Sequence, residues 1–156
     1  MLNKIKFCMV NDDDWDFLTN IRNETKEFHQ NTSSFTNAEY KKYIESQLNQ
    51  NKKNKHWTIW YENKPMGHAK IINQEIGYIL SSEFRQKGMM KFVFQQFELE
   101  AQKLEYEFIL QNIKTNNPIS VWSSIKNEWK MIGLEFDPST NLSRYNFKKD
   151  IVFKIS

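Results

Sequence analysis

Cysteine is almost absent from this sequence. The 156 residues include a single cysteine, Cys8, so the chain cannot form an internal disulfide. Cys8 lies within the apolar run from Ile5 to Val10, and a free cysteine in such a run behaves as a small hydrophobic residue. We therefore expect a buried, unreactive thiol at this position rather than a nucleophile.

Long hydrophobic runs are missing as well. No window approaches the roughly 20 apolar residues that a membrane-spanning helix needs, and the amino terminus has no signal-peptide core. The lysines are scattered and the formal net charge is only +3, which argues against a basic nucleic-acid-binding stripe. We expect no membrane partner, no nucleic-acid partner and, by default, a cytoplasmic protein.

The overall composition is that of one globular domain. Hydrophobic residues make up 39% of the sequence and charged residues 26%, and 156 residues suit one hydrophobic core better than two. The sequence contains no internal repeat and no linker-like segment. Residues 1–156 are therefore expected to form a single domain.

The spacing of apolar residues predicts a mixed α/β order of elements. Helices are indicated by the stripe that begins at Trp15, by the capping box from Thr36 to Glu39, and by apolar spacing over 89–104 and 120–132. Strands are expected at 5–10, 56–61, 66–72, 75–80 and 108–113, with two or three short strands after residue 134.

Glycine is scarce, so each glycine position is informative. Only four glycines occur, and Gly88 lies between an expected strand and the helix 89–104. Amides at a helix start lack intrahelical partners and can hold a phosphate, while Arg85 and Lys87 add positive charge. This segment alone leaves two interpretations open, an anion-binding loop or a basic turn that only starts a helix.

The segment from Arg85 to Met90, Arg-Gln-Lys-Gly-Met-Met, resembles the cofactor loop Gln/Arg-x-x-Gly-x-Gly/Ala of the GNAT N-acetyltransferases. Met90 departs from that pattern by replacing a small residue. Further segments resemble the family in the same order along the chain: Lys64–Gly67, Glu75–Leu80, Asn117–Ser120 and Gly133–Phe136. The resemblance implies the GNAT fold, an α/β fold with a mixed, mostly antiparallel sheet of six to seven strands flanked by about four helices.

The same resemblance implies acetyl-CoA as co-substrate and no metal. The backbone at Ile79, Leu80 and Ser81 would hold the pantetheine arm and polarise the thioester carbonyl. Asn117 would support the arm from the other side, or would only cap the helix before Pro118. The remaining residues implied at the cofactor are Arg85, Gln86, Lys87, Gly88, Met89 and Met90.

Acetyl transfer to an alkyl amine requires the amine in its neutral form. The pKa of such an amine lies about 3 units above neutral pH, so removing its proton costs roughly 4 kcal/mol. Glu75, at the start of the strand 75–80, is our candidate base acting through water; the alternative is an ordinary exposed carboxylate. His29, His56 and His68 are weaker candidates. The family often has a tyrosine that acts as the general acid, four residues before a closing glycine. If Gly133 is that glycine, the position holds Trp129, which cannot donate a useful proton. Tyr145 or a water is then the remaining candidate for the acid.

The amino-terminal third resembles the branch that includes ribosomal-protein and amino-sugar acetyltransferases. The acceptor would bind beside the first two helices, near Arg22, Asn23 and His29, although Arg22 could instead form only a surface salt bridge. We expect an N-acetyltransferase for a primary amine, with a small molecule such as an amino sugar or nucleotide sugar slightly ahead of a protein amino terminus. The alternative is a non-catalytic acyl-CoA sensor, and exposed strand edges suggest a homodimer.

Overall fold

A seven-stranded sheet runs through the part of the chain that the computed structural model describes, residues 4–29, 31–139 and 141–152. The strand order is β1-β2-β3-β4-β5-β7-β6, and only β4 and β5 are parallel neighbours. The expected mixed, mostly antiparallel sheet is therefore confirmed. Its strands are β1 (Ile5–Met9), β2 (Lys55–Tyr61), β3 (Lys64–Ile72), β4 (Glu75–Leu80), β5 (Phe108–Lys114), β6 (Lys130–Asp137) and β7 (Leu142–Asp150).

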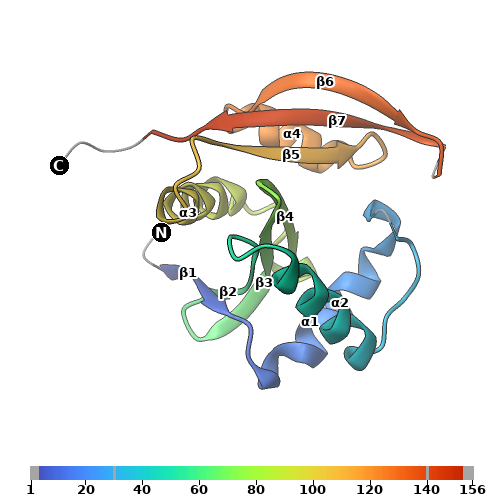
Figure 1. Ribbon diagram of the computed structural model, residues 1–156, viewed down its shortest axis with the longest axis vertical. Helices are drawn as coiled ribbons and strands as arrows, with labels where there is room; N and C mark the ends of the chain where they lie inside the picture. Colours follow the sequence, from blue (N-terminus) through green and yellow to red (C-terminus); the bar gives the residue numbers. More distant parts are fainter. Residues whose placement is uncertain (1–3, 30, 140, 153–156) are drawn as a thin grey trace.

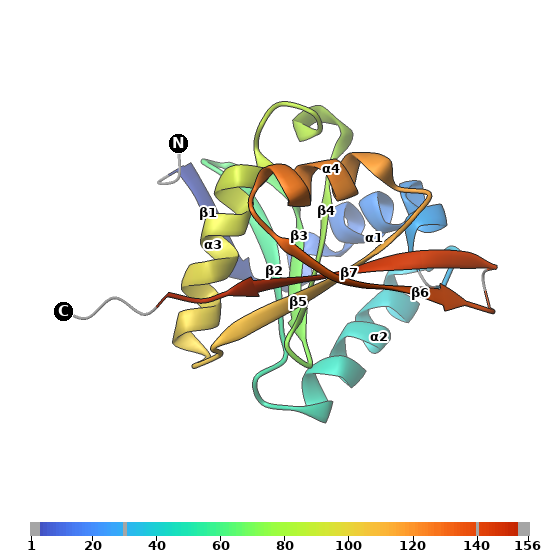
Figure 2. The ribbon, with the colours of Figure 1, turned by 90° about the horizontal axis from the view of Figure 1, so that it is seen from above.

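Helices cover both faces of this sheet. Helices α1 and α2 lie on one side of β1–β4 and α3 lies on the other, while α4 accompanies β5–β7 (Figures 1 and 2). Within the described residues no helix is both long enough and apolar enough to span a bilayer. The α-helices of this part of the chain are α1 (Trp15–Glu24), α2 (Asn37–Gln50), α3 (Met90–Lys103) and α4 (Pro118–Lys126).

The pleat of β2 and β3 separates two kinds of side chain. Trp57, Ile59 and Ala69 pack into the large core that α3 covers. The alternate positions point toward α1 and α2 and are mostly polar: His68 contacts Tyr40 of α2, and the Thr58 hydroxyl donates to Asp14 Oδ2 at 2.8 Å. Polar groups are thus buried against the first two helices.

Strands β4 and β5 are paired at one end only. Glu75 lies opposite Leu110, whose amide donates to the Gln74 carbonyl oxygen at 3.0 Å. Beyond this pair the strands diverge, and the β5–β7–β6 layer crosses over the β1–β4 layer (Figures 1 and 2). The divergence opens the middle of the sheet from one side of the molecule.

The expected helix 120–132 is wrong at its carboxyl end. Helix α4 ends at Lys126, and Glu128 adopts a left-handed φ of 68° before β6 begins at Lys130. Trp129 turns inward and packs on Phe94 of α3, with ring centroids 5.4 Å apart. Gly133 lies inside β6, and Asn127 is the carboxyl-terminal cap of α4.

The expected burial of Cys8 is also wrong, because Cys8 is exposed. In the edge strand β1 the alternate residues Ile5 and Phe7 take the inward face, so Cys8 points outward. The carboxyl-terminal part forms two long strands, β6 and β7, rather than two or three short ones.

Candidate functional site

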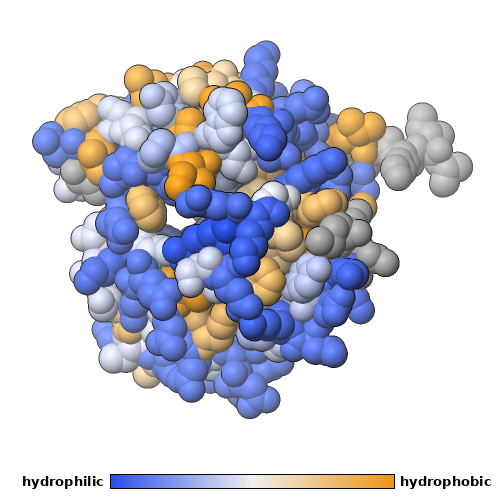
Figure 3. All heavy atoms as spheres, turned by 180° about the vertical axis from the view of Figure 1, so that it is seen from behind, coloured by the Kyte–Doolittle hydropathy of each residue, from blue (hydrophilic) through white to orange (hydrophobic). Residues whose placement is uncertain are grey.

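A cavity of about 1490 Å³ extends from helices α1 and α2, past the divergence of β4 and β5, to the amino-terminal ends of α3 and α4. The face in Figure 3 is hollowed between its upper and lower parts, and hydrophilic side chains border much of the hollow. The structure brings these sequence-predicted site residues to the cavity wall: Arg22, His29, Glu75, Ile79, Leu80, Arg85, Gln86, Gly88, Met89, Met90 and Asn117.

Four of the expected site residues do not line the cavity. Asn23 holds the loop that follows α1, because its side-chain amide forms two 2.8 Å hydrogen bonds with the backbone of Phe35. Tyr145 packs against the main core from β7, and Lys87 is exposed to solvent. The amide of Ser81 donates to a carbonyl of β3 instead of pointing at the cavity.

The loop before α3 presents a row of free amides. Gln86 and Gly88 have left-handed φ angles of 57° and 73°, and α3 begins at Met90. Among the described residues no acceptor is hydrogen-bonded to the amides of residues 86–90. A Cβ built on Gly88 would meet no atom within 4 Å, so the space in front of the loop is open. Free amides at a helix start beside open space can bind an anion.

Arg85 adds a fixed cation beside this loop. Its Nε donates to the Leu80 carbonyl oxygen at 2.8 Å, which anchors the guanidinium at the end of β4. One terminal nitrogen of the same guanidinium is buried without a hydrogen-bond partner. A guanidinium that is held in place with unused donors can bind a phosphate.

Asn117 fits both interpretations that its sequence allowed. Its side-chain oxygen accepts from the Ser120 amide at 3.4 Å and caps α4, and Pro118 occupies the first turn. The same side chain lines the cavity. The cap therefore does not remove Asn117 from the cavity wall.

Glu75 is half-buried at the point where β4 and β5 diverge. Burial raises the pKa of its carboxyl group, although the nearby Lys70 ammonium and a hydrogen bond with Asn112 act in the opposite direction. A carboxylate with a raised pKa takes up a proton closer to neutral pH and is a better base there.

A buried hydrogen-bond chain joins α2 to β2 and β3 at the end of the cavity that α1 and α2 border. The Tyr40 hydroxyl lies 3.1 Å from His68 Nδ1, His68 Nε2 lies 2.9 Å from His56 Nδ1, and His56 Nε2 lies 2.7 Å from Gln47 Oε1. Burial lowers the pKa of His56 to about 3 and that of His68 well below its usual value, so both rings are neutral.

With both rings neutral, all the hydrogen bonds of this series are donated in one direction, from Tyr40 toward Gln47. The Gln47 amide nitrogen donates to a tyrosine hydroxyl, which leaves Gln47 Oε1 to accept from His56 Nε2–H. His56 Nδ1 then accepts from His68 Nε2–H, and His68 Nδ1 accepts from the Tyr40 hydroxyl. Tyr40 lines the cavity. Because its proton is engaged, its oxygen is left to accept any further hydrogen bond.

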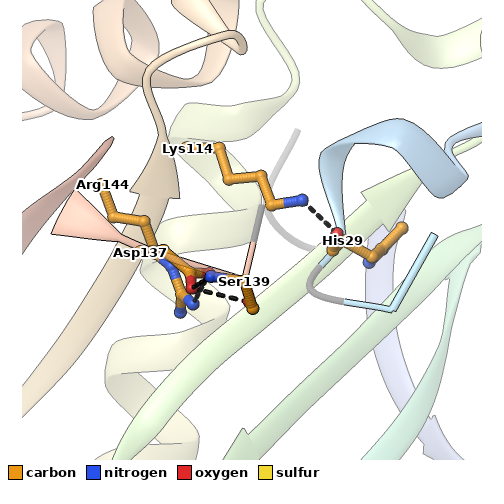
Figure 4. Close-up of polar contacts among 5 residues, drawn as sticks. All are labelled: His29, Lys114, Asp137, Ser139 and Arg144. Carbon is orange, nitrogen blue, oxygen red and sulfur yellow. Dashed lines mark hydrogen bonds and ion pairs between the residues drawn. The ribbon is translucent and has the colours of Figure 1, made fainter. Parts of the chain in front are cut away.

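Basic side chains gather around the same end of the cavity. Lys114 reaches across from β5 to donate to the His29 carbonyl oxygen, and Arg144 pairs with Asp137 at 2.5 Å (Figure 4). Arg22 donates to a backbone carbonyl of the facing loop and forms no salt bridge with any described carboxylate. Burial, followed by the charges of Arg22 and neighbouring lysines, lowers the pKa of His29 to about 3.

Tyr78 is a cavity residue that the sequence analysis missed. Its hydroxyl faces Ser120 and Ser124 of α4 but forms no hydrogen bond of good geometry, and burial raises its pKa to about 12. The position that the resemblance gives to a tyrosine is Trp129, which is buried against Phe94 of α3. The tyrosine hydroxyl near α4 therefore comes from β4.

The sequence carried only weak signals for the other missed residues. Tyr40 directly follows the capping box at Thr36–Glu39 and is buried, but nothing in the local sequence indicates its contact with His68. Lys70 and His68 share a strand face by alternation, a signal that could have been used. Lys114 ends β5, and nothing local indicates that it contacts a residue 85 positions away.

Comparisons with known proteins give a consistent picture of the fold. No family model and no curated protein sequence matches this chain. The Microcin C7 self immunity acetyltransferase MccE, solved with acetyl-CoA and AMP, superposes with a TM-score of 0.77 and 18% identity, covering 96% of this chain and 93% of that chain. RimL, a ribosomal L7/L12 alpha-N-protein acetyltransferase solved with coenzyme A, gives 0.79 and 14%, covering 95% and 94%.

A third solved structure extends the comparison to a different acceptor. The spermidine N-acetyltransferase from Vibrio cholerae, solved with CoA and spermine, has a TM-score of 0.80 and 13% identity, and 96% of each chain is covered. Identities this low establish the fold alone. The chain therefore has the GNAT fold that these acetyltransferases share.

Proposed function

We propose that this chain is an acetyl-CoA-dependent N-acetyltransferase that transfers the acetyl group directly to a primary amine in a ternary complex. The observation that carries the proposal is the row of free amides at residues 86–90, which opens onto a cavity that continues past Glu75 to a second, polar end. Several solved structures of this fold contain acetyl-CoA or CoA. One continuous cavity suits two substrates that react directly.

The cofactor would lie along the wall from α3 to the diverging strands. In this arrangement the amides of Gln86 to Met90 and the Arg85 guanidinium bind the pyrophosphate. The backbone of Ile79 and Leu80 holds the pantetheine arm and polarises the thioester carbonyl, and Asn117 borders the arm opposite. Ser81 and Lys87 do not line the cavity, which makes them the weakest of the expected contacts.

The acceptor amine would approach from the α1–α2 side. Its nitrogen attacks the thioester carbonyl carbon, the carbon–sulfur bond breaks, and the amine proton passes through water to Glu75. The Tyr40 oxygen, whose own proton is engaged with His68, accepts a hydrogen bond from the amine. Tyr78 donates a hydrogen bond to the leaving thiolate, which needs little help because a thiol titrates only about 1.5 units above neutral pH.

We propose a small-molecule acceptor in preference to a protein amino terminus. The loop after α1 closes this end of the cavity, because Asn23 binds Phe35 and Lys114 binds His29 across it. The MccE structure, which has a comparable fold, contains AMP, and this supports a small acceptor. RimL, by contrast, acts on a ribosomal protein. An amino sugar or a nucleotide-linked amine fits this end.

A second copy of the chain would pair through β6. This strand is the outer edge of the sheet, and its Ile132, Leu134 and Phe136 side chains are exposed. The homodimer expected from exposed strand edges stays a prediction.

The test of the function is release of free thiol from acetyl-CoA in the presence of a panel of primary amines, alongside calorimetric titration of acetyl-CoA and CoA. Acetyl-CoA binding with thiol release for at least one amine class supports the proposal. Tight binding without thiol release across the panel would instead support the acyl-CoA sensor. Absence of binding to acetyl-CoA and CoA would refute the cofactor site and the reaction together.

A further inference from the structure

Three cations from three different elements meet at the acceptor end of the cavity. Arg22 comes from α1, Lys70 from β3 and Lys114 from β5, and all three line the cavity wall. The Lys70 stem lies over Gly77, because a Cβ on that glycine would sit 2.5 Å from Lys70 Cε. Arg22 and Lys114 are only 4% and 5% exposed, so their charges are largely removed from water.

None of these three cations has a carboxylate partner. Within the described residues no salt bridge includes Arg22, Lys70 or Lys114. Arg22 and Lys114 donate to backbone carbonyls, which carry no net charge, and the second terminal nitrogen of Arg22 is buried with no hydrogen-bond partner. The neighbouring Arg144 differs, since Asp137 neutralises it. Buried cations without counter-charges are costly, and an anion that enters between them is stabilised.

The pKa shifts of the three cations and of His29 agree with an excess of positive charge at this end of the cavity. Burial and then neighbouring cations lower the pKa values of Lys114 and His29, and burial lowers those of Arg22 and Lys70. Two carboxylates act in the opposite direction: Glu75 raises the pKa of Lys70, and Asp137, which is paired with Arg144, raises that of Lys114. Positive groups therefore outnumber negative ones at this end.

We propose that the acceptor amine carries an anionic oxygen group, a phosphate or a carboxylate, and that Arg22, Lys70 and Lys114 bind it. This inference rests on the proposed function, because it describes the acceptor of the same reaction. A polycation such as spermine, present in one solved structure of this fold, would be repelled here. The acceptor would then be held by two groups, its anionic group on the cation cluster and its amine toward the neighbouring Tyr40 and Glu75.

The experiment compares matched amines that differ in one anionic group. The pairs are O-phosphoethanolamine with ethanolamine, glucosamine 6-phosphate with glucosamine, and 4-aminobutyrate with butylamine, which distinguishes phosphate from carboxylate. With saturating acetyl-CoA, we expect kcat/KM to be about tenfold or more higher for the anionic member of at least one pair. Thiol release that favours the neutral member of every pair, or treats both alike, overturns the inference and leaves the proposed function standing.

Variants separate this site from a general loss of structure. Lys114→Gln and Arg22→Lys should raise KM for the preferred anionic amine by about tenfold while changing KM for its neutral partner less than twofold. Lys42→Gln, on the exposed face of α2 outside the cavity, is the matched control and should change neither. Equal effects on both members of the pair would contradict the site.

A binding readout covers the case in which no amine reacts. Calorimetric titration of O-phosphoethanolamine and 4-aminobutyrate into protein saturated with coenzyme A should give binding that Lys114→Gln weakens and Lys42→Gln does not. Saturation blocks the diphosphate loop, so this signal cannot come from the cofactor site. No binding of either anion overturns the inference. If coenzyme A itself fails to bind, the proposed function falls, and the same titration on the free protein decides the anion site.

Discussion

At the residue scale, the backbone conformation of Gly88 bears on the proposed cofactor site. Its φ of 73° disfavours any side chain, and the space in front of it is open. We expect Gly88→Asp to weaken acetyl-CoA binding at least 100-fold, because it places a negative charge at the proposed diphosphate site. Calorimetric titration measures the change, and circular dichroism reports whether the fold is intact.

Gly88→Asn is the matched control for that substitution. Asparagine has nearly the same size and tolerates left-handed φ, but it adds no charge. A much smaller loss of affinity in this variant would assign the effect to charge. If both variants bind acetyl-CoA as the wild type does, the diphosphate site lies elsewhere.

A substitution at Tyr78 tests how the leaving thiolate is stabilised in the proposed reaction. Tyr78 lines the cavity, and its buried hydroxyl lies beside Ser120 and Ser124, whereas Tyr145 packs into the core. We expect Tyr78→Phe to lower kcat by about tenfold with little change in KM for the amine, because only a hydrogen bond formed late in the reaction is lost. Steady-state kinetics measures both constants.

Tyr145→Phe in the same assay tests the expectation drawn from the sequence. A larger fall in kcat for Tyr145→Phe than for Tyr78→Phe would return the acid role to Tyr145. Equal activity of both variants with the wild type would assign the proton to water.

At the scale of elements, the capping box stabilises the amino-terminal end of α2, which borders the proposed acceptor site. The Glu39 amide donates to the Thr36 hydroxyl at 3.2 Å, and the Thr36 amide donates to Glu39 Oε1 at 3.0 Å. We expect Thr36→Ala to lower the free energy of unfolding by about 1 kcal/mol. Urea titration measures the loss, and Thr36→Ser should restore most of it. An unchanged midpoint for Thr36→Ala would mean that packing alone holds this helix start.

The pH dependence of stability belongs to the whole molecule, because the buried histidines connect α2 to the sheet. The pKa values of His29 and His56 fall to about 3, and that of His68 is also lowered, while the unfolded chain titrates near 6.5. The unfolded state therefore binds more protons below pH 6.5. Stability should fall as pH decreases from 6.5 toward 3, by about 1.4 kcal/mol per pH unit for each histidine.

Urea titrations at pH 7, 6 and 5 measure this slope. In that window the raised pKa of Glu75 acts with the opposite sign, and the cations Lys70 and Arg22 add to the cost of protonating the histidines. His56→Gln should flatten the slope by removing one titrating ring. Stability that stays constant between pH 6.5 and 5 would mean that these rings bind protons in the folded state.

Local sequence features determined much of this protein. Apolar spacing over one helix turn or one strand pair predicted α1–α3 and β1–β5, and the Thr36 capping box and the glycine-containing loop were readable because their interactions span a few residues. The error at α4 has the same origin, because the apolar residues of 120–132 fit a helix locally. In the folded chain Trp129 packs on Phe94 in the core, and the residues from Lys130 onward pair with β7.

Only the tertiary structure decided the chemistry of the cavity. The direction of the Tyr40–His68–His56 chain, the unpaired cations at Arg22 and Lys114 and the approach of Tyr78 to α4 all depend on contacts between distant segments. Burial and charge neighbours set the protonation state of each group, and these are properties of the packed molecule. Spacing along the chain specifies which element a residue joins, whereas folding specifies which charges it meets.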